Sequence, residues 1–476
     1  MDQLNQILHG DCLELLKQLP GECVDSCVSD VPYGLGKKEP TPEEILQYLQ
    51  GADLNMGGDF MGKDWDIPSI PVWKEVYRVL KPGSYLTIFG GTRTFDLISM
   101  GLRMAGFICR DTIADEFPAH LEILEHLGPV EMELPILQWV YSSGMPKSTN
   151  ISLYLDKKKG LNPDSKNYVP ISDEAKALKH LGSGLKPSWE PILVFRKPFK
   201  GTLVSNVLAH GTGALNIDGT RVKHASKADF EGHKKQVEAI KAKGGVRGNS
   251  WKNDSDLSGA NEVTEAGRWP ANLTLTHTQE CVFQEEEDTS SWRCVPGCPI
   301  REMDNLSGDR PSTLTGRADP NKSHSHPGSE FNSNSTFLGE RTHHSNVYAD
   351  SGGASRFFQQ FDGVPFRYMP KANRKEAGCG VFKVLHPTPK PVKLMQYLVR
   401  LVTPKGGLVL DPFCGSASTC HAAVLEGMNY LGIERDKESW EEATRRMSIV
   451  HEIIQEEQDA QDLYLTAMDI EVVRRS

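Results

Sequence analysis

The stretch 408–434 constrains the fold of this chain more than any other. An apolar run at 408–410 leads into a turn of small residues around Gly415, and a helical pattern follows over 419–426. A second apolar run then ends at an acid, Glu434. This order predicts a strand-helix-strand unit of a nucleotide-binding sheet, because an acid about 20 residues beyond the turn is suited to ribose hydroxyls.

A second stretch, residues 29–34, forms an unusual corner. It follows the apolar run 24–28, which is typical of a short buried strand. Asp30 offers a carboxylate acceptor, Pro32 favours extended geometry in the residue before it, and Tyr33 offers a flat ring for stacking. Together these groups can hold a planar ring that carries an exocyclic amino group. A turn of this composition also arises by chance, so the stretch alone leaves both interpretations open.

With these stretches and others in one order, the chain resembles the DNA amino-methyltransferases that use S-adenosylmethionine, in the beta class, where the catalytic motif precedes the cofactor motif. The matching pieces are His9-Gly10-Asp11-Cys12, Asp30-Val31-Pro32-Tyr33, Leu80-Lys81-Pro82-Gly83, Trp189-Glu190-Pro191-Ile192-Leu193-Val194, His386-Pro387-Thr388-Pro389-Lys390-Pro391, Asp411-Pro412-Phe413-Cys414-Gly415-Ser416 and Gly432-Ile433-Glu434. The resemblance covers both ends of the chain and, more loosely, its middle.

The resemblance implies an α/β fold with a doubly wound, mostly parallel, Rossmann-like sheet and a large irregular insert. We expect residues 1–200 to form the catalytic half and residues 351–476 the cofactor-binding half. Between them, 201–350 is polar, rich in Gly, Ser and Asn, and is expected to be the variable target-recognition region.

For the catalytic half, the resemblance implies that Asp30 and a carbonyl of Val31 or Pro32 accept hydrogen bonds from the amino group of a base, and that Tyr33 stacks on that base. Such an amine is a poor nucleophile because its lone pair is delocalised into the ring, and two acceptors free that pair. The base must flip out of the duplex at a cost of a few kcal/mol, of which stacking returns roughly 1–3 kcal/mol. In this family Asp accompanies adenine N6 more often than cytosine N4, so adenine is favoured.

For the cofactor half, the resemblance implies contacts with S-adenosylmethionine. The implied residues are Asp11 at the adenine amino group, Glu434 at the ribose, Asp411, Phe413 and Gly415 at the turn that faces the methionine part, and Thr388 and Lys390 at the carboxylate end. Two plainer interpretations remain open: Asp11 also reads as the N-cap of a helix, and Lys390 as a surface charge.

Two positions depart from the pattern of the family. Val31 replaces the usual Pro, and Ala417 replaces the usual Gly. If position 417 requires a positive φ, alanine costs ~1 kcal/mol or more there. These departures leave a catalytically impaired DNA-binding relative as the alternative function. Methylation of an amide in a protein is a third hypothesis, because such enzymes use a similar corner. Asp30 argues against it, since that corner has an Asn at this position.

A separate group of residues has the composition of a metal site. His277 and Cys281 form one i, i+4 pair, and Cys294 and Cys298 form another around a Pro-Gly turn. Four such ligands suit a structural tetrahedral zinc, which would anchor the insert and take no part in methyl transfer. The alternative is free cysteines that pack as small apolar side chains.

The charge of the chain is uneven. The net charge is −10, which is awkward for a double-stranded DNA partner, but residues 221–252 carry a basic run that suits phosphates. A solvated helix face is the alternative for that run. No apolar run is long enough for a membrane, and the scattered cysteines favour reduced thiols and a cytoplasmic location. We expect a monomer or a homodimer.

Overall fold

The computed structural model describes residues 4–34, 36, 38–57, 66–109, 136–140, 150–161, 168–184, 189–224, 227–242, 263–278, 280–286, 289–296, 298–307, 310–311, 351–352, 358–361 and 389–475. The chain divides into two compact units. The first comprises Met1–Thr220, Asn272–Gln279 and Phe361–Ser476, and the second comprises Arg221–Ala271 and Glu280–Gln360.

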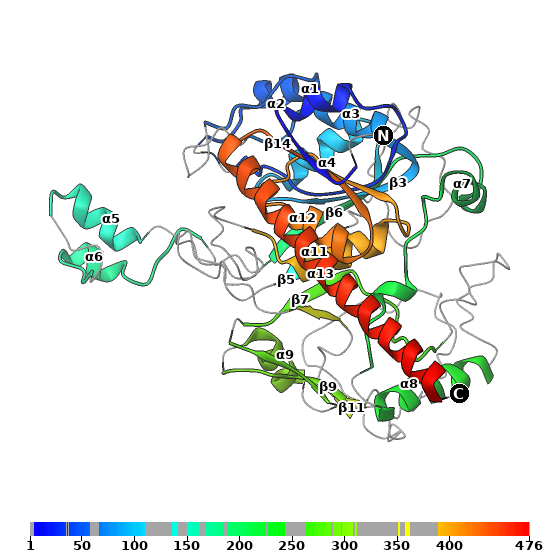
Figure 1. The fold of residues 1–476 in the computed structure, drawn as a ribbon. Coiled ribbons are helices and arrows are strands. Elements are labelled where there is room, and N and C mark those ends of the chain that lie inside the picture. Colours follow the sequence, from blue (N-terminus) through cyan, green and yellow to red (C-terminus); the bar gives the residue numbers. More distant parts are fainter. Residues whose placement is uncertain are drawn as a thin grey trace, which may run out of the picture. The chain divides into compact units, whose positions relative to one another are not determined.

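The first unit is built on one mixed sheet (Figure 1). Its strands lie in the order β1 (Gln6–His9), β14 (Asn429–Glu434), β13 (Leu408–Asp411), β2 (Val24–Asp30), β3 (Leu80–Phe89), β6 (Trp189–Arg196), β5 (Ile136–Val140), β7 (Leu273–Thr276) and β12 (Gln359–Phe361), and β4 (Ile108–Cys109) also pairs with β6. The strands from β1 to β3 are all parallel, as are β5 and β7, whereas β6 is antiparallel to its neighbours. The expectation of a mostly parallel sheet is confirmed.

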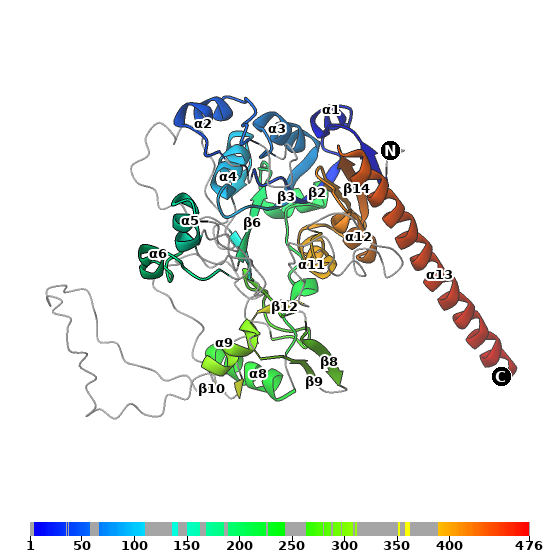
Figure 2. The same ribbon diagram turned by 90° about the vertical axis from the view of Figure 1, so that its left-hand side faces the viewer.

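Helices cover both faces of this sheet (Figure 2). One face packs against α1 (Cys12–Lys17), α3 (Ile70–Val79) and α4 (Phe95–Met104), and the other against α11 (Val392–Val402), α12 (Ser418–Leu425) and the first part of α13 (Lys437–Arg475). In β13, Leu408 and Leu410 belong to the first core and Val409 to the second. Burial on both faces explains why this strand is apolar throughout, and it makes the fold doubly wound.

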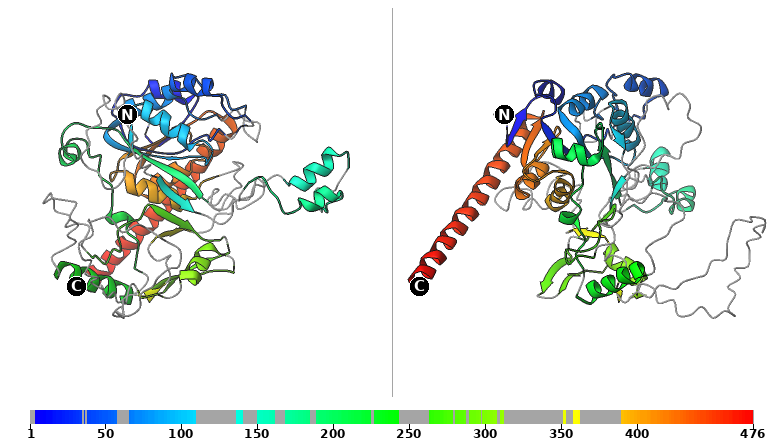
Figure 3. Two further views of the ribbon diagram at one scale, coloured as in Figure 1. Left: turned by 180° about the vertical axis from the view of Figure 1, so that it is seen from behind. Right: turned by 90° about the vertical axis from the view of Figure 1, so that its right-hand side faces the viewer.

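The remaining elements of the first unit are short helices. They are α2 (Pro42–Leu49), α5 (Ile151–Lys158), α6 (Asp173–Ala177), α7 (Leu203–His210) and the 3-10 turn η2 (Asp218–Thr220). Figure 3 shows the chain from two further sides; α13 packs against β1, the edge strand of the sheet, and against β14 beside it.

In chain order, the described part of the second unit contains a helix, a hairpin, a second helix and a short antiparallel strand pair. These are α8 (Lys227–Ala242), the β8 (Val282–Glu286) and β9 (Thr289–Arg293) pair, α9 (Pro299–Ser307), and the β10 (Arg310–Pro311) and β11 (Ser351–Gly352) pair. The short strand β12 (Gln359–Phe361) follows where the chain passes back to the first unit. A buried bidentate ion pair, Asp229 with Arg268 at 2.6 Å for both contacts, fixes the start of α8.

Among the described residues, none of the helices has the length and apolar character needed to span a lipid bilayer.

Candidate active site

The two halves of the sheet meet at β13 and β2, which are adjacent and parallel. Leu410 is in register with Cys27, so the carboxyl ends of both strands lie at one edge. The Ser29 hydroxyl of β2 donates a 2.6 Å hydrogen bond to Asp411 Oδ1 of β13. On one side of this pair the sheet continues to β14 and β1, and on the other to β3. Such a switch point is where open α/β sheets bind ligands.

The corner that follows β2 contains a buried charge cluster. The Lys390 ammonium lies 2.8 Å from Asp30 Oδ1 and 3.4 Å from Glu190 Oε2. It also donates a 3.0 Å hydrogen bond to the Tyr33 hydroxyl, which in turn donates one of 2.9 Å to Glu190 Oε2. Two carboxylates, one ammonium and one phenol therefore form a single network, and they come from three segments that are far apart in the sequence.

The protonation state of this network follows from its surroundings. Burial alone lowers the pKa of Lys390, but the carboxylates of Asp30 and Glu190 outweigh it and raise that pKa above its usual range. Burial and the same two carboxylates hold the pKa of Tyr33 well above its usual value. The network thus contains a permanent ammonium and a neutral phenol at pH 7.

The Lys390 ammonium is enclosed by aromatic rings as well as by acids. It lies 5.2 Å from the centroid of the Tyr33 ring, 5.0 Å from that of Phe89 and 6.0 Å from that of Trp139. Because the side chain is buried, the interpretation of Lys390 as a surface charge is wrong. Its predicted contact with the carboxylate of the cofactor stays a prediction.

The Asp30 carboxylate is partly exposed, although its Oδ1 is buried against the Lys390 ammonium. The corner behind it is rigid: Val31 is buried, and the Thr94 hydroxyl donates a 2.6 Å hydrogen bond to the Tyr33 carbonyl. Pro32 is half-buried between them.

The turn after β13 is organised by two acids. Asp411 Oδ1 accepts from the backbone N–H of Phe413 at 3.2 Å as well as from Ser29, and burial raises the pKa of Asp411 to about 6. Glu434 accepts the N–H of Gly415 on Oε2 and that of Asp436 on Oε1, both at 2.8 Å. Burial raises the pKa of Glu434, and these two N–H groups oppose the shift.

Ala417 occupies the left-handed region at this turn, with φ 63° and ψ 33°. It is fully buried and stands immediately before α12. Alanine is strained in this conformation, which glycine adopts freely. Position 417 therefore does require a positive φ, and the alanine that replaces the usual glycine there costs stability.

Arg446 on α13 is a contributor to the turn that the sequence did not reveal. It is fully buried, and its guanidinium donates a 2.6 Å hydrogen bond to the carbonyl of Ser416. The same group lies 3.1 Å from Nδ1 of His421. Burial and this neighbouring guanidinium lower the pKa of His421 to about 3. No motif marks Arg446, and an arginine is not a residue type that a sequence pattern predicts to be buried.

The other predicted cofactor residues have separate outcomes. Asp11 is the N-cap of α1, since its carboxylate accepts the N–H groups of Leu13 at 2.9 Å and Glu14 at 3.2 Å, so that interpretation is confirmed. Its contact with adenine stays a prediction. Thr388 lies outside the described residues.

An aromatic pair lies next to the acid that ends β14. His9 is in register with Glu434, and its ring stacks on Trp440 with centroids 5.1 Å apart. The Trp440 indole N–H donates a 2.8 Å hydrogen bond to the carbonyl of Ile7. The edge of the sheet at Glu434 is thus flanked by flat rings.

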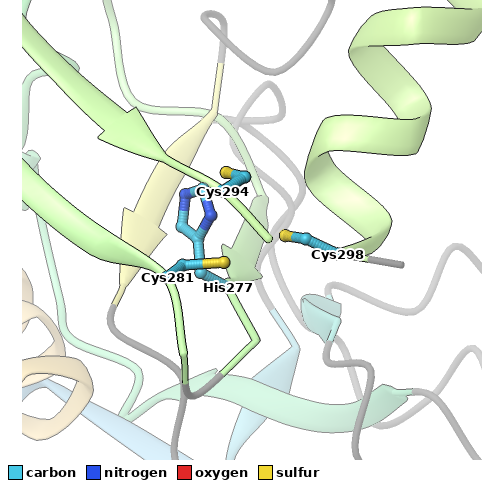
Figure 4. Close-up of side chains that lie close together, drawn as sticks. All are labelled: His277, Cys281, Cys294 and Cys298. Carbon is cyan, nitrogen blue, oxygen red and sulfur yellow. The ribbon is translucent and has the colours of Figure 1, made fainter. Parts of the chain in front are cut away.

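The predicted metal ligands lie together in the continuous stretch 277–298 (Figure 4). The ligand atoms of His277, Cys281, Cys294 and Cys298 are all within 4.8 Å of one another. Burial and the neighbouring Cys298 and Cys281 thiols raise the pKa of Cys294 to about 12.

Comparisons with known proteins agree on one family. A family model described as DNA methylase, N6_N4_Mtase, matches residues 24–445. The type II methyltransferase M2.MboI of Moraxella bovis is 40% identical over 72 residues, which is 15% of this chain and 26% of that protein. The DNA adenine methyltransferase YhdJ of Escherichia coli K12 is 35% identical over 72 residues, 15% of this chain and 24% of that protein. The matched part thus spans about a quarter of the length of these relatives.

A solved structure of similar extent is the cytosine-N4-specific PvuII DNA methyltransferase. It is 13% identical, with 95% of this chain and 93% of that chain covered, at a TM-score of 0.39.

Proposed function

The chain belongs to the N6/N4 DNA methylase family, as its motifs indicate, and from this premise we propose that it transfers a methyl group from S-adenosylmethionine to an exocyclic amino group of a DNA base. The base is flipped out of the duplex, and adenine N6 is favoured over cytosine N4. Flipping is required because an amino group inside a stacked duplex cannot be approached in line.

The observation that carries the proposal is the shared edge of β2 and β13. Asp30 and Tyr33 follow one strand, Phe413 and Gly415 follow the other, and Leu410 of β13 is in register with Cys27 of β2. An amino group held at the first pair and a cofactor held at the second would meet across this edge. In-line placement of two reactants supplies ~7–11 kcal/mol of the barrier.

The residues at the cofactor turn fit the proposed cofactor. Gly415 has a φ of 50°, which lets the backbone of the turn approach a ligand closely. Glu434 uses one lone pair on each oxygen for backbone N–H groups, and the carboxylate keeps further acceptor sites for ribose hydroxyls. The stacked His9 and Trp440 rings offer an apolar wall for an adenine. S-adenosylmethionine supplies a methyl group that its sulfonium charge has already activated.

The corner residues act on the amine. The Asp30 carboxylate accepts a hydrogen bond from the amino group, draws its nitrogen toward tetrahedral geometry and takes the proton that the product must lose. The Lys390 ammonium at 2.8 Å keeps that carboxylate in place. Tyr33, as a neutral phenol hydrogen-bonded to Glu190, has its ring orientation fixed for stacking on the base.

The choice of adenine rests on two points. In the family that the motifs indicate, an Asp at position 30 accompanies adenine more often than cytosine. In addition, a relative of 35% identity over 72 residues is named a DNA adenine methyltransferase.

The second unit is proposed to hold DNA through α8. Lys227, Lys234 and Lys235 are exposed on this helix, as is Lys223 just before it, whereas the nearby Asp229 is buried in its pair with Arg268. Because Asp229 is buried in its ion pair, the surface of this segment is more positively charged than its sequence alone indicates. The phosphates of DNA are the partners that suit such a surface.

A catalytically impaired relative is the second candidate, which Ala417 favours. The strained φ of 63° lies in the turn where the cofactor would bind. Titration of S-adenosylmethionine into the protein by calorimetry separates the two functions: an enzyme binds the cofactor, whereas an impaired relative binds it weakly or not at all.

The deciding experiment combines the purified protein, unmethylated DNA and isotopically labelled S-adenosylmethionine. The DNA is digested and its nucleosides are separated by chromatography and mass spectrometry. We expect labelled N6-methyladenine. Labelled N4-methylcytosine would overturn the choice of base, and the absence of any methylated base on diverse genomic DNA would overturn the proposed activity. Sequencing DNA from expressing cells with modified-base detection then gives the recognition sequence.

A further inference from the structure

We propose that His277, Cys281, Cys294 and Cys298 bind one structural zinc ion. The ligand atoms of these four side chains lie within 4.8 Å of one another (Figure 4). Zn–S bonds of about 2.3 Å in a tetrahedron place sulfur ligands roughly 3.8 Å apart, so the set closes around an ion by movements of about 1 Å or less.

The local fold brings the ligands together from within one stretch of chain. In the β8–β9 hairpin Val282 is in register with Arg293, so Cys281 and Cys294 are the next opposed pair beyond it. The two thiols are held side by side by the strand register, not by a chance approach of loops.

The fourth position is set by a tight turn. The N–H of Cys298 donates a 3.2 Å hydrogen bond to the carbonyl of Val295, which folds the chain back directly after Cys294. The carbonyl of Cys298 then accepts the N–H of Glu302, so Cys298 also begins α9. Arg301 of that helix donates to the Cys294 carbonyl at 3.1 Å, which ties the helix to the turn.

The burial and chemistry of the set point to a closed structural site. His277, Cys281 and Cys298 are buried, and Cys294 is half-buried. Three thiolates and one imidazole in a tetrahedron are a common zinc set, with no position left for water. An iron–sulfur cluster is the other metal group that thiolates favour, but its corners spread the ligands more widely than this set.

The first test measures metal in the full-length protein purified without chelator. Inductively coupled plasma mass spectrometry is expected to find one zinc per chain. Titration with a mercurial thiol reagent is expected to release that zinc as three thiols are modified. Replacement by Co²⁺ is expected to give the visible absorption of a tetrahedral thiolate site. Protein without zinc that also gives no such absorption after refolding with Co²⁺ would overturn the proposal.

The second test assigns the ligands. The triple variant Cys281→Ser/Cys294→Ser/Cys298→Ser is expected to lose the zinc, while the matched control Cys23→Ser, a half-buried cysteine on the segment before β2, keeps it. If the triple variant kept one zinc per chain, the site would lie elsewhere. If it did not fold, the thiol-coupled zinc release from the unmodified chain would still decide the matter, since release without modification of three cysteines contradicts the assignment.

Discussion

The ammonium of Lys390 lies 2.8 Å from Oδ1 of Asp30, although the two residues come from opposite ends of the chain. Lys390 is buried next to Glu190, so two carboxylates share one positive charge. This ion pair joins the segment before α11 to the corner at the end of β2.

Lys390→Met is expected to lower the free energy of unfolding by about 3 kcal/mol or more, because removing one partner leaves buried carboxylates uncompensated. The double variant Lys390→Met/Glu190→Gln should recover part of that loss, since it removes one of the two acids. Urea denaturation followed by circular dichroism measures both. Lys393→Met, which removes an exposed lysine near the start of α11, serves as the matched control and should change stability by less than about 0.5 kcal/mol. A loss below about 1 kcal/mol for Lys390→Met would contradict a stabilising role for the pair.

Asp411 is expected to make stability depend on pH in the acid range. Burial raises its pKa from 3.8 to about 6 in the folded chain, so the folded state binds the proton more tightly than the unfolded state between these values. The free energy of unfolding should therefore fall as pH rises from about 4 to about 6, by up to about 3 kcal/mol at 1.36 kcal/mol per pKa unit. Asp411→Asn keeps an acceptor for Ser29 and Phe413 and should flatten this decline. An unchanged pH profile in the variant would rule out Asp411 as its source.

Substitutions at Ala417 should report the strain of its φ of 63°. Ala417→Gly relieves roughly 1–2 kcal/mol of left-handed strain, but it loses a buried methyl worth about 0.8 kcal/mol and frees the unfolded chain by about 0.4–1 kcal/mol. These effects nearly cancel, so the net change should stay within about 1 kcal/mol. Ala417→Val keeps the strain and overpacks a fully buried position, and should cost more than about 2 kcal/mol. Equal stability of the two variants in chemical denaturation would refute the left-handed assignment.

Three exposed lysines of α8 should set part of the salt dependence of DNA binding. The triple variant Lys227→Ala/Lys234→Ala/Lys235→Ala is expected to weaken binding on any DNA sequence. It should also reduce the slope of log K against log salt by up to about 3, because each phosphate that a lysine neutralises contributes about 0.9 to that slope. Fluorescence anisotropy at several salt concentrations measures the slope. Lys405→Ala is the control. It removes an exposed lysine at the amino end of β13, whereas the candidate active site lies at the carboxyl end of that strand, and it should leave the slope unchanged. An unchanged slope in the triple variant would assign DNA binding to another surface.

The sequence predicts the elements of the cofactor half well, because their periodicity is undisturbed. The helical pattern at 419–426 appears as α12 (Ser418–Leu425), and the run that ends at Glu434 appears as β14. Prediction was poorer where a local signal competes with packing. Lys81-Pro82-Gly83 is typical of a turn that ends a helix, yet these residues lie inside β3, which begins at Leu80 and shifts register opposite Val24 and Ser26.

The site itself was predictable only in part. Asp30, Tyr33 and Gly415 lie in local motifs, and so they could be named from the sequence. The pairing of Lys390 with Asp30 could not, because it depends on β13 lying beside β2 and on α11 packing against the sheet. The role of Arg446 in fixing the turn could not be predicted for the same reason, because its contact with Ser416 depends on α13 packing beside the turn.

The central claim is that Asp30 activates the amino group while the cofactor is held by the other half of the sheet. The most direct measurement is methyl transfer to DNA by Asp30→Ala, with cofactor affinity measured by calorimetry on the same preparation, and with Asp30→Asn as the variant that keeps the shape of the side chain. We expect Asp30→Ala to abolish turnover while its affinity for S-adenosylmethionine stays nearly intact. Near-normal turnover by Asp30→Ala would contradict the role of Asp30 as the acceptor that activates the amino group.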